Sequence, residues 1–281
     1  MKLRGGCREN NMTAVKAVVL DWAGTIIDFG SRAPTRVFIE VFRQFGIDIS
    51  VEQARGPMGL PKLDHIRELG KLEHVRNHWR AAYGGDFDDA AAHRIYEVFV
   101  PRNTKVVVDY ATLIPGAAET VRRLRQHGIR IGSTTGYTRK IMEPVLPLAA
   151  KQGYAPDNLV CAEDLWTGRP TPVMMWKCFL DLQIADPASV VKVDDTRVGL
   201  AEGIAAGTWA VGVSLSGNEV GLSPQELAAL PEPRRTAMNA QAREKLAAAG
   251  AHCVIDTIAD LPVALDQIEE RLASGEKPGQ Q

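Results

Sequence analysis

A short apolar run near the beginning of the chain, residues 17–20, ends abruptly in Asp21, and a turn of small residues follows. Consecutive Ala, Val and Leu residues predict a strand that is buried on both faces, which is typical of a parallel sheet. Open parallel sheets bind their ligands beyond the carboxyl ends of the strands. Asp21 is therefore a candidate site residue, with an Asp that only caps the following turn as the simpler alternative.

Similar apolar runs alternate with helical patterns in the second half of the chain. Strands are expected over residues 129–133, 159–161, 190–193, 209–213 and 253–255. Apolar residues recur at helical spacing between them, for example over 139–152 and 237–249. Strands that alternate with helices indicate parallel strand–helix–strand units. We therefore predict an α/β fold built on a doubly wound parallel sheet.

Helical signals fill the range from residue 30 to about residue 105, where no strand pattern appears. The apolar residues from Val37 to Phe45 form one stripe, and Gly46 ends it. Pro61 suits the first turn of a further helix, and a break at 83–86 divides the remaining helical pattern. This range therefore reads as a helical insertion, a cap or lid over the sheet.

A chain of 281 residues is long enough for one large domain or two smaller ones. We expect a loose leader at residues 1–12 and an α/β core formed by residues 13–29 and 109–281. The helical cap is expected at residues 30–108, inserted between the two core segments.

The composition excludes several classes of function. With 45% hydrophobic and 24% charged residues the chain is globular, and a net charge of -1 offers no basic surface for nucleic acid or an anionic membrane. No apolar run is long enough to span a bilayer, and residues 1–12 lack the apolar core of a signal peptide. The four cysteines are far apart, which indicates reduced thiols and a cytoplasmic protein.

Polar residues at the predicted strand ends form a candidate site together with Asp21. Thr135 and Asp195 end or follow later strands, and a loop presents Arg169. Asp21 and Asp195 would repel each other at one sheet edge unless a cation such as Mg²⁺ lay between them. Thr135, the amides near Gly136 and Arg169 would bind a phosphoryl group, and Asp21 could form an acyl phosphate as nucleophile. Each residue alone is a weak signal, but the set favours this functional interpretation.

These residues also carry a resemblance. The segment Asp21–Thr25, DWAGT, is similar to the first motif of the haloacid dehalogenase superfamily, and Thr135, Arg169 and Asp194–Thr196 match its second, third and fourth motifs. Segments spread over most of the chain resemble more specifically the phosphonoacetaldehyde hydrolase (phosphonatase) family: DWAGTIIDFG, GPMGLPKLDHIREL, GSTTGYTR, GRPTP and VDDT. The resemblance implies a haloacid dehalogenase-like core, a small phosphonate substrate, C–P bond hydrolysis in 2-aminoethylphosphonate breakdown, and a homodimer with contacts through the cap.

Ala23 departs from the pattern of the superfamily's phosphatases, which typically place an Asp there as general acid for the leaving group. A carbon leaving group would not need this acid, but it would need an electron sink. Lys62 could supply one by condensing with an aldehyde, since the protonated imine accepts the electron pair of the broken C–P bond. The resemblance independently implies that Lys62 forms this Schiff base.

The surroundings of Lys62 suggest how its amine becomes reactive. The first turn of a helix disfavours an ammonium, and apolar neighbours such as Met58 add desolvation, so we predict a pKa of roughly 7–8. Met58 would shape the pocket, with simple core packing as the alternative. His65 lies one turn further on the same face and could position or deprotonate the amine, with a structural role as the alternative.

The expected metal ligands are the carboxylates of Asp21 and Asp195 and the carbonyl of Ala23. Many superfamily members carry another Asp four residues after the Asp of the fourth motif, where this chain has Gly199. The metal would then have fewer protein carboxylates, and water and substrate would complete its shell. Asp194 could hold these ligands in place or cap a helix.

Three alternatives stay open from the sequence. A phosphomonoesterase or phosphomutase of the same superfamily would lack its acid at Ala23. A catalytically silent binding or regulatory protein would not need Asp21, Lys62, Arg169 and Asp195 together. A C–P hydrolase acting on a related aldehyde or ketone is not excluded, because the sequence does not give the shape of the pocket.

Overall fold

The computed structural model describes residues 13–279, so the leader expected at residues 1–12 lies outside the described part. A six-stranded sheet with the order β3-β2-β1-β4-β5-β6 forms its centre, and every neighbouring pair of strands is parallel. The strands are β1 (Ala17–Leu20), β2 (Arg130–Thr135), β3 (Val160–Cys161), β4 (Val190–Asp194), β5 (Trp209–Val213) and β6 (Cys253–Ile255). The predicted α/β fold with a doubly wound parallel sheet is confirmed.

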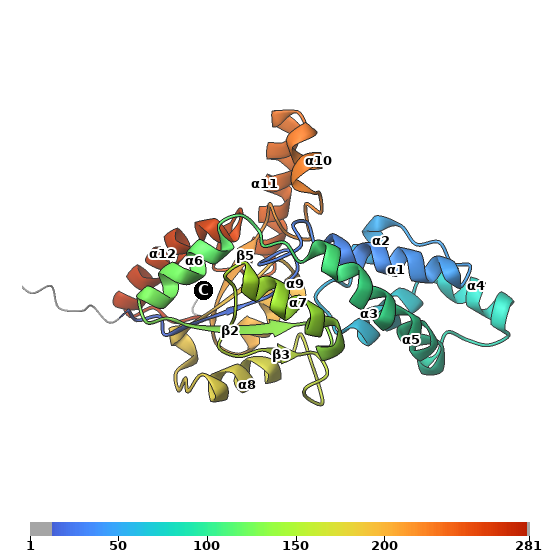
Figure 1. Ribbon diagram of the computed structural model, residues 1–281, viewed down its shortest axis with the longest axis horizontal. Coiled ribbons are helices and arrows are strands. Elements are labelled where there is room, and N and C mark those ends of the chain that lie inside the picture. Colours follow the sequence, from blue (N-terminus) through green and yellow to red (C-terminus); the bar gives the residue numbers. More distant parts are fainter. Residues whose placement is uncertain (1–12, 280–281) are drawn as a thin grey trace, which may run out of the picture.

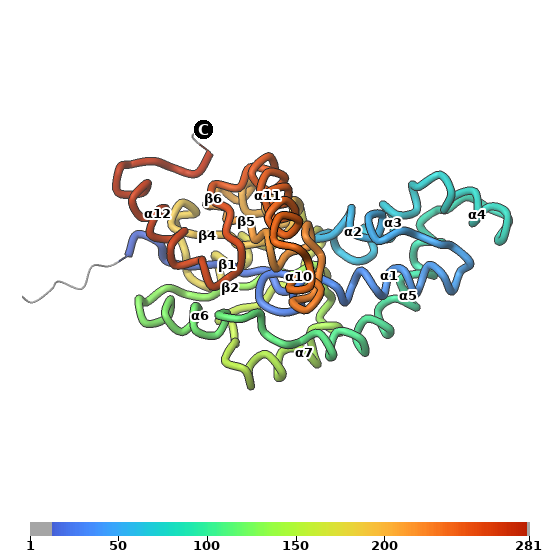
Figure 2. Tube along the Cα trace, turned by 90° about the horizontal axis from the view of Figure 1, so that it is seen from above, coloured from blue at the N-terminus to red at the C-terminus, as the bar shows by residue number. Residues whose placement is uncertain are grey.

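Helices cover both faces of this sheet, as Figures 1 and 2 show. Val18 and Leu20 of β1 face one hydrophobic cluster, while Ala17 and Val19 face another, because side chains alternate along a strand. The first cluster contains residues of α6 (Ala117–Gln126), α7 (Arg139–Lys151) and α12 (Leu261–Ala273). On the other face lie α8 (Val173–Asp181), α9 (Arg197–Ala205) and α11 (Glu232–Ala248).

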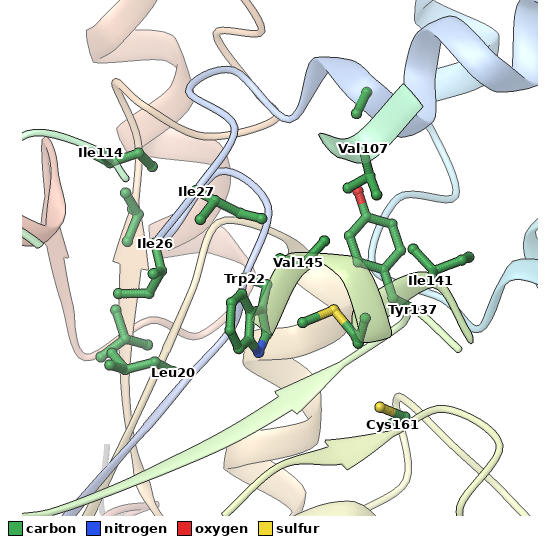
Figure 3. Close-up of a cluster of buried hydrophobic side chains, with 14 of the residues drawn as sticks. Leu20, Trp22, Ile26, Ile27, Val107, Ile114, Tyr137, Ile141, Val145 and Cys161 are labelled. Carbon is green, nitrogen blue, oxygen red and sulfur yellow. The ribbon is translucent and has the colours of Figure 1, made fainter. Parts of the chain in front are cut away.

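The turn after β1 is anchored in the first hydrophobic cluster. Figure 3 shows Trp22 and Ile27 of this turn near Val145 of α7, and Ile26 and Ile141 belong to the same buried cluster. All these side chains are fully buried. The backbone that carries Asp21 is therefore held by packing on both sides of the residue.

The helices formed by residues 32–106 project to one side of the sheet (Figure 1). They are α1 (Arg32–Gln44), α2 (Val51–Arg55), α3 (Lys62–Gly70), α4 (Glu73–Tyr83) and α5 (Asp89–Val106), and the 3₁₀ helix η1 (Val107–Tyr110) leads back to the core. In the stripe predicted for α1, Val37, Phe38, Val41 and Phe42 are buried, Phe45 just after the helix is half-buried, and Gly46 follows with a φ of 78°. The expected helices without a strand are confirmed, whereas the division into core and cap domains at residues 30 and 108 stays a proposal.

Some elements were not expected. The short helices α2 and α10 (Pro224–Ala229) each begin with a serine capping box, and η2 (Pro187–Ser189) and η3 (Ile258–Asp260) are 3₁₀ turns. Helix α11 begins at Glu232 rather than 237, because Pro233 is tolerated in a first turn. No helix in the described part of the chain is long and apolar enough to cross a membrane.

Candidate active site

The carboxyl ends of β1, β2 and β4 meet at one edge of the sheet and carry predicted site residues. Asp21 directly follows β1, Thr135 is the last residue of β2, and Asp195 directly follows β4. The N–H of Asp21 donates to the carbonyl of Val193 at 3.0 Å, which joins the first strand end to the fourth. The strand order reverses between β1 and β4, and this is where doubly wound sheets bind ligands.

A small cavity lies at this edge, between the sheet and the loop before α3. Its volume is about 20 Å³, little more than one water molecule requires. The predicted site residues in its lining are Asp21, Ala23, Met58, Lys62, Thr135, Gly136, Arg169 and Asp195. The structure therefore brings together side chains that are far apart in the sequence, from the sheet edge and from the projecting helices.

His65 is the one predicted site residue that does not line this cavity. Its side chain is fully buried, with Nε2 3.0 Å from the carbonyl oxygen of Ala54 and the ring stacked on Phe38. Burial, and then the charge of Lys62, lower the pKa of His65 well below its usual value. This arrangement supports a structural role for a neutral His65 next to Lys62, and no contact with the cavity.

Asp21, Asp194 and Asp195 form a cluster of buried carboxylates. One oxygen from each lies within 4.8 Å of the others. Burial, followed by the charges of Asp21 and Asp194, raises the pKa of Asp195 well above its usual value. Oδ1 of Asp195 is buried and has no hydrogen-bond partner among the described residues. Hard oxygen donors that include an unpartnered carboxylate oxygen fit a divalent cation such as Mg²⁺.

The side chain of Asp194 occupies the space that a side chain at position 199 would fill. A Cβ at Gly199 would lie 1.9 Å from Oδ2 of Asp194. Asp194 thus adds a third carboxylate to the acidic cluster, but it pairs with Arg169 and Lys192, so the expectation that Gly199 leaves the metal with fewer protein carboxylates stays a prediction. Oδ1 of Asp194 also accepts hydrogen bonds from the N–H and hydroxyl of Thr196, at 3.0 and 2.7 Å.

The guanidinium of Arg169 lies between these carboxylates. Its Nη2 is 2.9 Å from Oδ1 of Asp21 and 3.3 Å from Oδ2 of Asp194, and donates to the carbonyl of Thr134 at 2.8 Å. Nε donates to Oε2 of Glu202 at 3.0 Å. Burial alone would lower the pKa of Arg169, but the surrounding carboxylates outweigh it and raise the pKa. The result is a permanently charged, oriented fork, which suits phosphoryl oxygens.

Beneath Arg169 lie two fully buried charged residues that the sequence analysis does not identify, Lys192 and Glu202. Nζ of Lys192 donates to the hydroxyl of Thr134 at 2.7 Å and lies 3.1 Å from Oδ2 of Asp194 and 3.3 Å from Oε2 of Glu202. The one signal in the sequence is that Lys192 interrupts the apolar run of β4. Buried charges are normally paired in this way, since an isolated one is costly.

Lys62, the first residue of α3, is buried and lines the same cavity as Asp21 and Asp195. Its Nζ lies 4.9 Å from the ring centroid of Tyr137 and 5.9 Å from that of Phe38. Burial lowers the pKa of Lys62 to about 8, although the charges of Asp21 and Asp195 oppose the shift. About a tenth of the amine would then be neutral and nucleophilic at pH 7.

Asp21 remains mostly ionised at neutral pH. Burial, and then the charge of Asp194, raise the pKa of Asp21 to about 6, against the effect of Arg169 and Lys192. Burial alone would also raise the pKa of Asp194, but the same two cations outweigh it and lower that pKa. Asp21 is therefore available as an anionic nucleophile.

Close backbone contacts hold the loop before α3 against the sheet edge. A Cβ at Gly59, whose φ is +95°, would lie 2.4 Å from the hydroxyl oxygen of Thr196. A Cβ at Gly136 would lie 2.7 Å from the carbonyl oxygen of Leu60. Glycine at both positions lets the loop approach closely enough to bring Lys62 to the cavity.

Comparisons with known proteins identify the family of this chain. A model of the haloacid dehalogenase-like hydrolases matches residues 15–207. A phosphonoacetaldehyde hydrolase from Paraburkholderia phytofirmans is 48% identical, covering 95% of this chain and 100% of that protein, and one from Klebsiella pneumoniae is 47% identical, covering 95% and 100%. The crystal structure of a phosphonoacetaldehyde hydrolase-like protein from Oleispira antarctica superposes with a TM-score of 0.93 at 41% identity, covering 99% of each chain. The chain therefore belongs to the haloacid dehalogenase-like hydrolases and, among them, to the phosphonoacetaldehyde hydrolase family.

Proposed function

We propose that this enzyme hydrolyses the C–P bond of phosphonoacetaldehyde to acetaldehyde and inorganic phosphate. The observation that carries the proposal is that one small cavity contains both Asp21, a carboxylate, and Lys62, an amine whose pKa is lowered to about 8. The relatives named phosphonoacetaldehyde hydrolase, at 44–48% identity, support the choice of substrate.

A divalent cation such as Mg²⁺ fits the acidic cluster. The carboxylates of Asp21 and Asp195 and the carbonyl of Ala23 would hold it, while Asp194 stays paired with Arg169 and Lys192. When bound, such an ion neutralises the carboxylates and polarises phosphoryl oxygens.

Lys62 begins the reaction. Its neutral amine attacks the aldehyde and water leaves, which gives a protonated imine. The carboxylate of Asp21 attacks phosphorus in line with the C–P bond, and the electron pair of that bond moves into the imine. The products of this step are an enamine on Lys62 and an aspartyl phosphate on Asp21. Thr135, the amides near Gly136 and Arg169 stabilise the charge on the phosphoryl oxygens.

Water completes the cycle at both covalent centres. The enamine takes a proton on carbon, and hydrolysis of the resulting imine releases acetaldehyde and the Lys62 amine. A second water hydrolyses the aspartyl phosphate to inorganic phosphate. Since imine formation released one water, the overall reaction consumes one, as hydrolysis of the C–P bond requires.

A phosphate ester would not find the aspartate that superfamily phosphatases place at position 23 as the acid for the leaving group, because this chain has Ala23 there. Asp21 and Asp195 are the only carboxylates in the lining described here. The nearby Asp28 accepts the N–H groups of Arg32 and Ala33 at 3.0 and 2.9 Å and so caps α1. We therefore favour C–P cleavage over a phosphomonoesterase or phosphomutase activity.

Product analysis tests this proposal. We expect phosphonoacetaldehyde to give equal amounts of phosphate, followed by ³¹P NMR, and acetaldehyde, followed by a coupled alcohol dehydrogenase. Lys62→Ala should lower kcat by at least about 10³-fold, because it removes a covalent catalyst. Lys71→Ala is the control and should leave the rate unchanged. Lys71 directly follows the same helix, is exposed and pairs with Glu68. Full activity in Lys62→Ala would refute the mechanism.

The resemblance also points to 2-aminoethylphosphonate degradation in the cytoplasm and to a homodimer. These remain proposals, and analytical ultracentrifugation tests the last one directly. If the sedimentation coefficient corresponds to a monomer at all micromolar protein concentrations, the dimer is excluded.

A further inference from the structure

An arginine at the end of α2 connects the projecting helices to the core. Nη1 of Arg55 donates to the carbonyl oxygens of Gly30, at 2.9 Å, and Asn218, at 3.0 Å. Nη1 also lies 3.2 Å from the amide oxygen of Asn218, and Nη2 donates to the carbonyl of Gly221 at 2.8 Å. One side chain thus joins α2, the segment that leads into α1, and the loop after β5.

The guanidinium of Arg55 is held in a specific set of hydrogen bonds rather than in a surface ion pair. Within residues 13–279 its hydrogen bonds go to neutral carbonyl and amide oxygens. A Cβ at Gly221 would lie 2.5 Å from Cζ of Arg55, so only glycine lets the loop lie against the guanidinium. The flat, rigid fork of arginine can satisfy several fixed carbonyls at once, which a lysine cannot do.

Asn218 links Arg55 to the acidic cluster. Its backbone N–H donates to Oδ2 of Asp195 at 2.8 Å, while its carbonyl and amide oxygens accept from Arg55. The other oxygen of this carboxylate, Oδ1, is buried and unpartnered among the described residues. With Oδ2 occupied by the amide, Oδ1 is the oxygen left for a cation.

We propose that Arg55 is a positioning residue that makes the acidic site depend on the docking of α2. When α2 lies on the core, Arg55 fixes Asn218, and Asn218 orients Asp195 with Oδ1 directed to the cation. When α2 moves away, as the small cavity requires for substrate entry, this support is lost. The inference rests on the proposed function, and it adds that closure and cation binding strengthen each other, because such coupling is reciprocal.

The test is the Mg²⁺ affinity of the substrate-free protein, measured by titration calorimetry on Arg55→Met and the wild type. We expect Arg55→Met to raise the Kd for Mg²⁺ about 10- to 100-fold, the usual cost of losing a residue that orients a metal ligand. Arg55→Lys should recover only part of the affinity. Arg67→Met is the matched control, since Arg67 lies on α3 in exposed ion pairs with Asp64 and Asp89, and it should bind Mg²⁺ as the wild type does.

Asn218→Ala keeps the backbone N–H that reaches Asp195 but removes the amide oxygen that accepts from Arg55. Its Kd should rise in the same direction by a smaller factor, and it replaces Arg55→Met as the test if that variant does not fold. A second readout is hydrogen exchange of residues 214–222. Mg²⁺ should slow it in the wild type and have little effect in Arg55→Met.

Unchanged Mg²⁺ affinity in folded Arg55→Met, or in Asn218→Ala if only that variant folds, would overturn the inference. This result is independent of the reaction, because no substrate is present. Failure of the wild type to release phosphate from phosphonoacetaldehyde would instead overturn the proposed function and leave the calorimetric comparison valid.

Discussion

In the proposed mechanism, the pairing of Ala23 with Lys62 decides which bond this site breaks. Ala23 takes the place of the aspartate that would protonate an ester's leaving group beside Asp21, the proposed nucleophile. Lys62 offers an electron sink to an aldehyde instead. Its burial is what makes the amine usable, since the pKa falls from an ordinary 10.5 to about 8.

The pH dependence of kcat/KM should report this pKa. The neutral amine is the reacting form, so kcat/KM for phosphonoacetaldehyde should rise with pH and level off above about 8. A bound divalent cation nearby would move the rise to lower pH, because it further disfavours the ammonium. Initial rates between pH 5.5 and 10 are the measurement, and a rise centred near the ordinary lysine value would contradict the assignment.

Gly199 is a second position where the addition of one methyl group should disturb the site. In Gly199→Ala the new methyl group would meet Oδ2 of Asp194 at 1.9 Å, so that carboxylate or the start of α9 must shift. We expect a loss of about 1–3 kcal/mol of stability, as for other overpacked sites, and weaker Mg²⁺ binding. Urea denaturation measures the first effect. Gly85→Ala is the control, since nothing lies within 4 Å of the added methyl group there.

At the level of elements, β4 and α9 share a buried ion pair that supports the site from below. Lys192 on β4 and Glu202 on α9 are both fully buried and 3.3 Å apart, and both contact groups that hold Arg169. A buried pair of this kind is weak evidence for stability in itself, but removing one partner leaves an unpaired charge. We infer that its role is to fix the direction of Arg169.

A double-mutant cycle tests this pair. Lys192→Met and Glu202→Met should each lower the free energy of unfolding by about 3–5 kcal/mol, because each removes one charge from a buried network in which Lys192 also pairs with Asp194 and Glu202 with Arg169. The double variant should lose much less than the sum of the two. Additive losses in urea denaturation would show that the two residues act separately.

The elements that carry the site could be predicted largely because their signals are local. The apolar run before Asp21 indicates where a strand ends, and the proline before Lys62 indicates where a helix begins. The resemblance then supplied the meaning of Ala23. Helix α12 also carries a regular apolar stripe, at Leu261, Ala264, Leu265 and Ile268, although no helix was predicted there from the sequence.

The residues that the sequence did not reveal are those whose role is made by contacts over long distances in the chain. Arg55 meets Asn218 across 163 positions. Asp194 takes the place of a side chain at position 199 only because β4 and α9 fold back on each other, and no spacing rule expresses that. His65 lies close to Lys62, as the spacing predicted, but this spacing does not bring it into the lining of the cavity, and its role stays a prediction.

For the whole molecule, the two residues proposed to form covalent intermediates come from different parts of the fold. Asp21 directly follows β1 and Lys62 begins α3. Figure 2 shows α3 among the helices that project from the sheet. The cavity of about 20 Å³ is little larger than one water molecule requires, so we expect the helices to open for substrate entry and then to close around the substrate. The contacts of Gly59, Gly136 and Arg55 describe the closed form.

The central claim is that Lys62 and Asp21 act in succession on one substrate, and borohydride trapping with peptide mapping tests it most directly. With phosphonoacetaldehyde and borohydride, the wild type should gain a reduced adduct on the peptide that contains Lys62, and Lys62→Ala should gain none. Asp21→Ala should still form the adduct but release no phosphate, because the imine precedes attack on phosphorus. Absence of an adduct at Lys62 in an active wild type, or phosphate release by Asp21→Ala, would contradict the account.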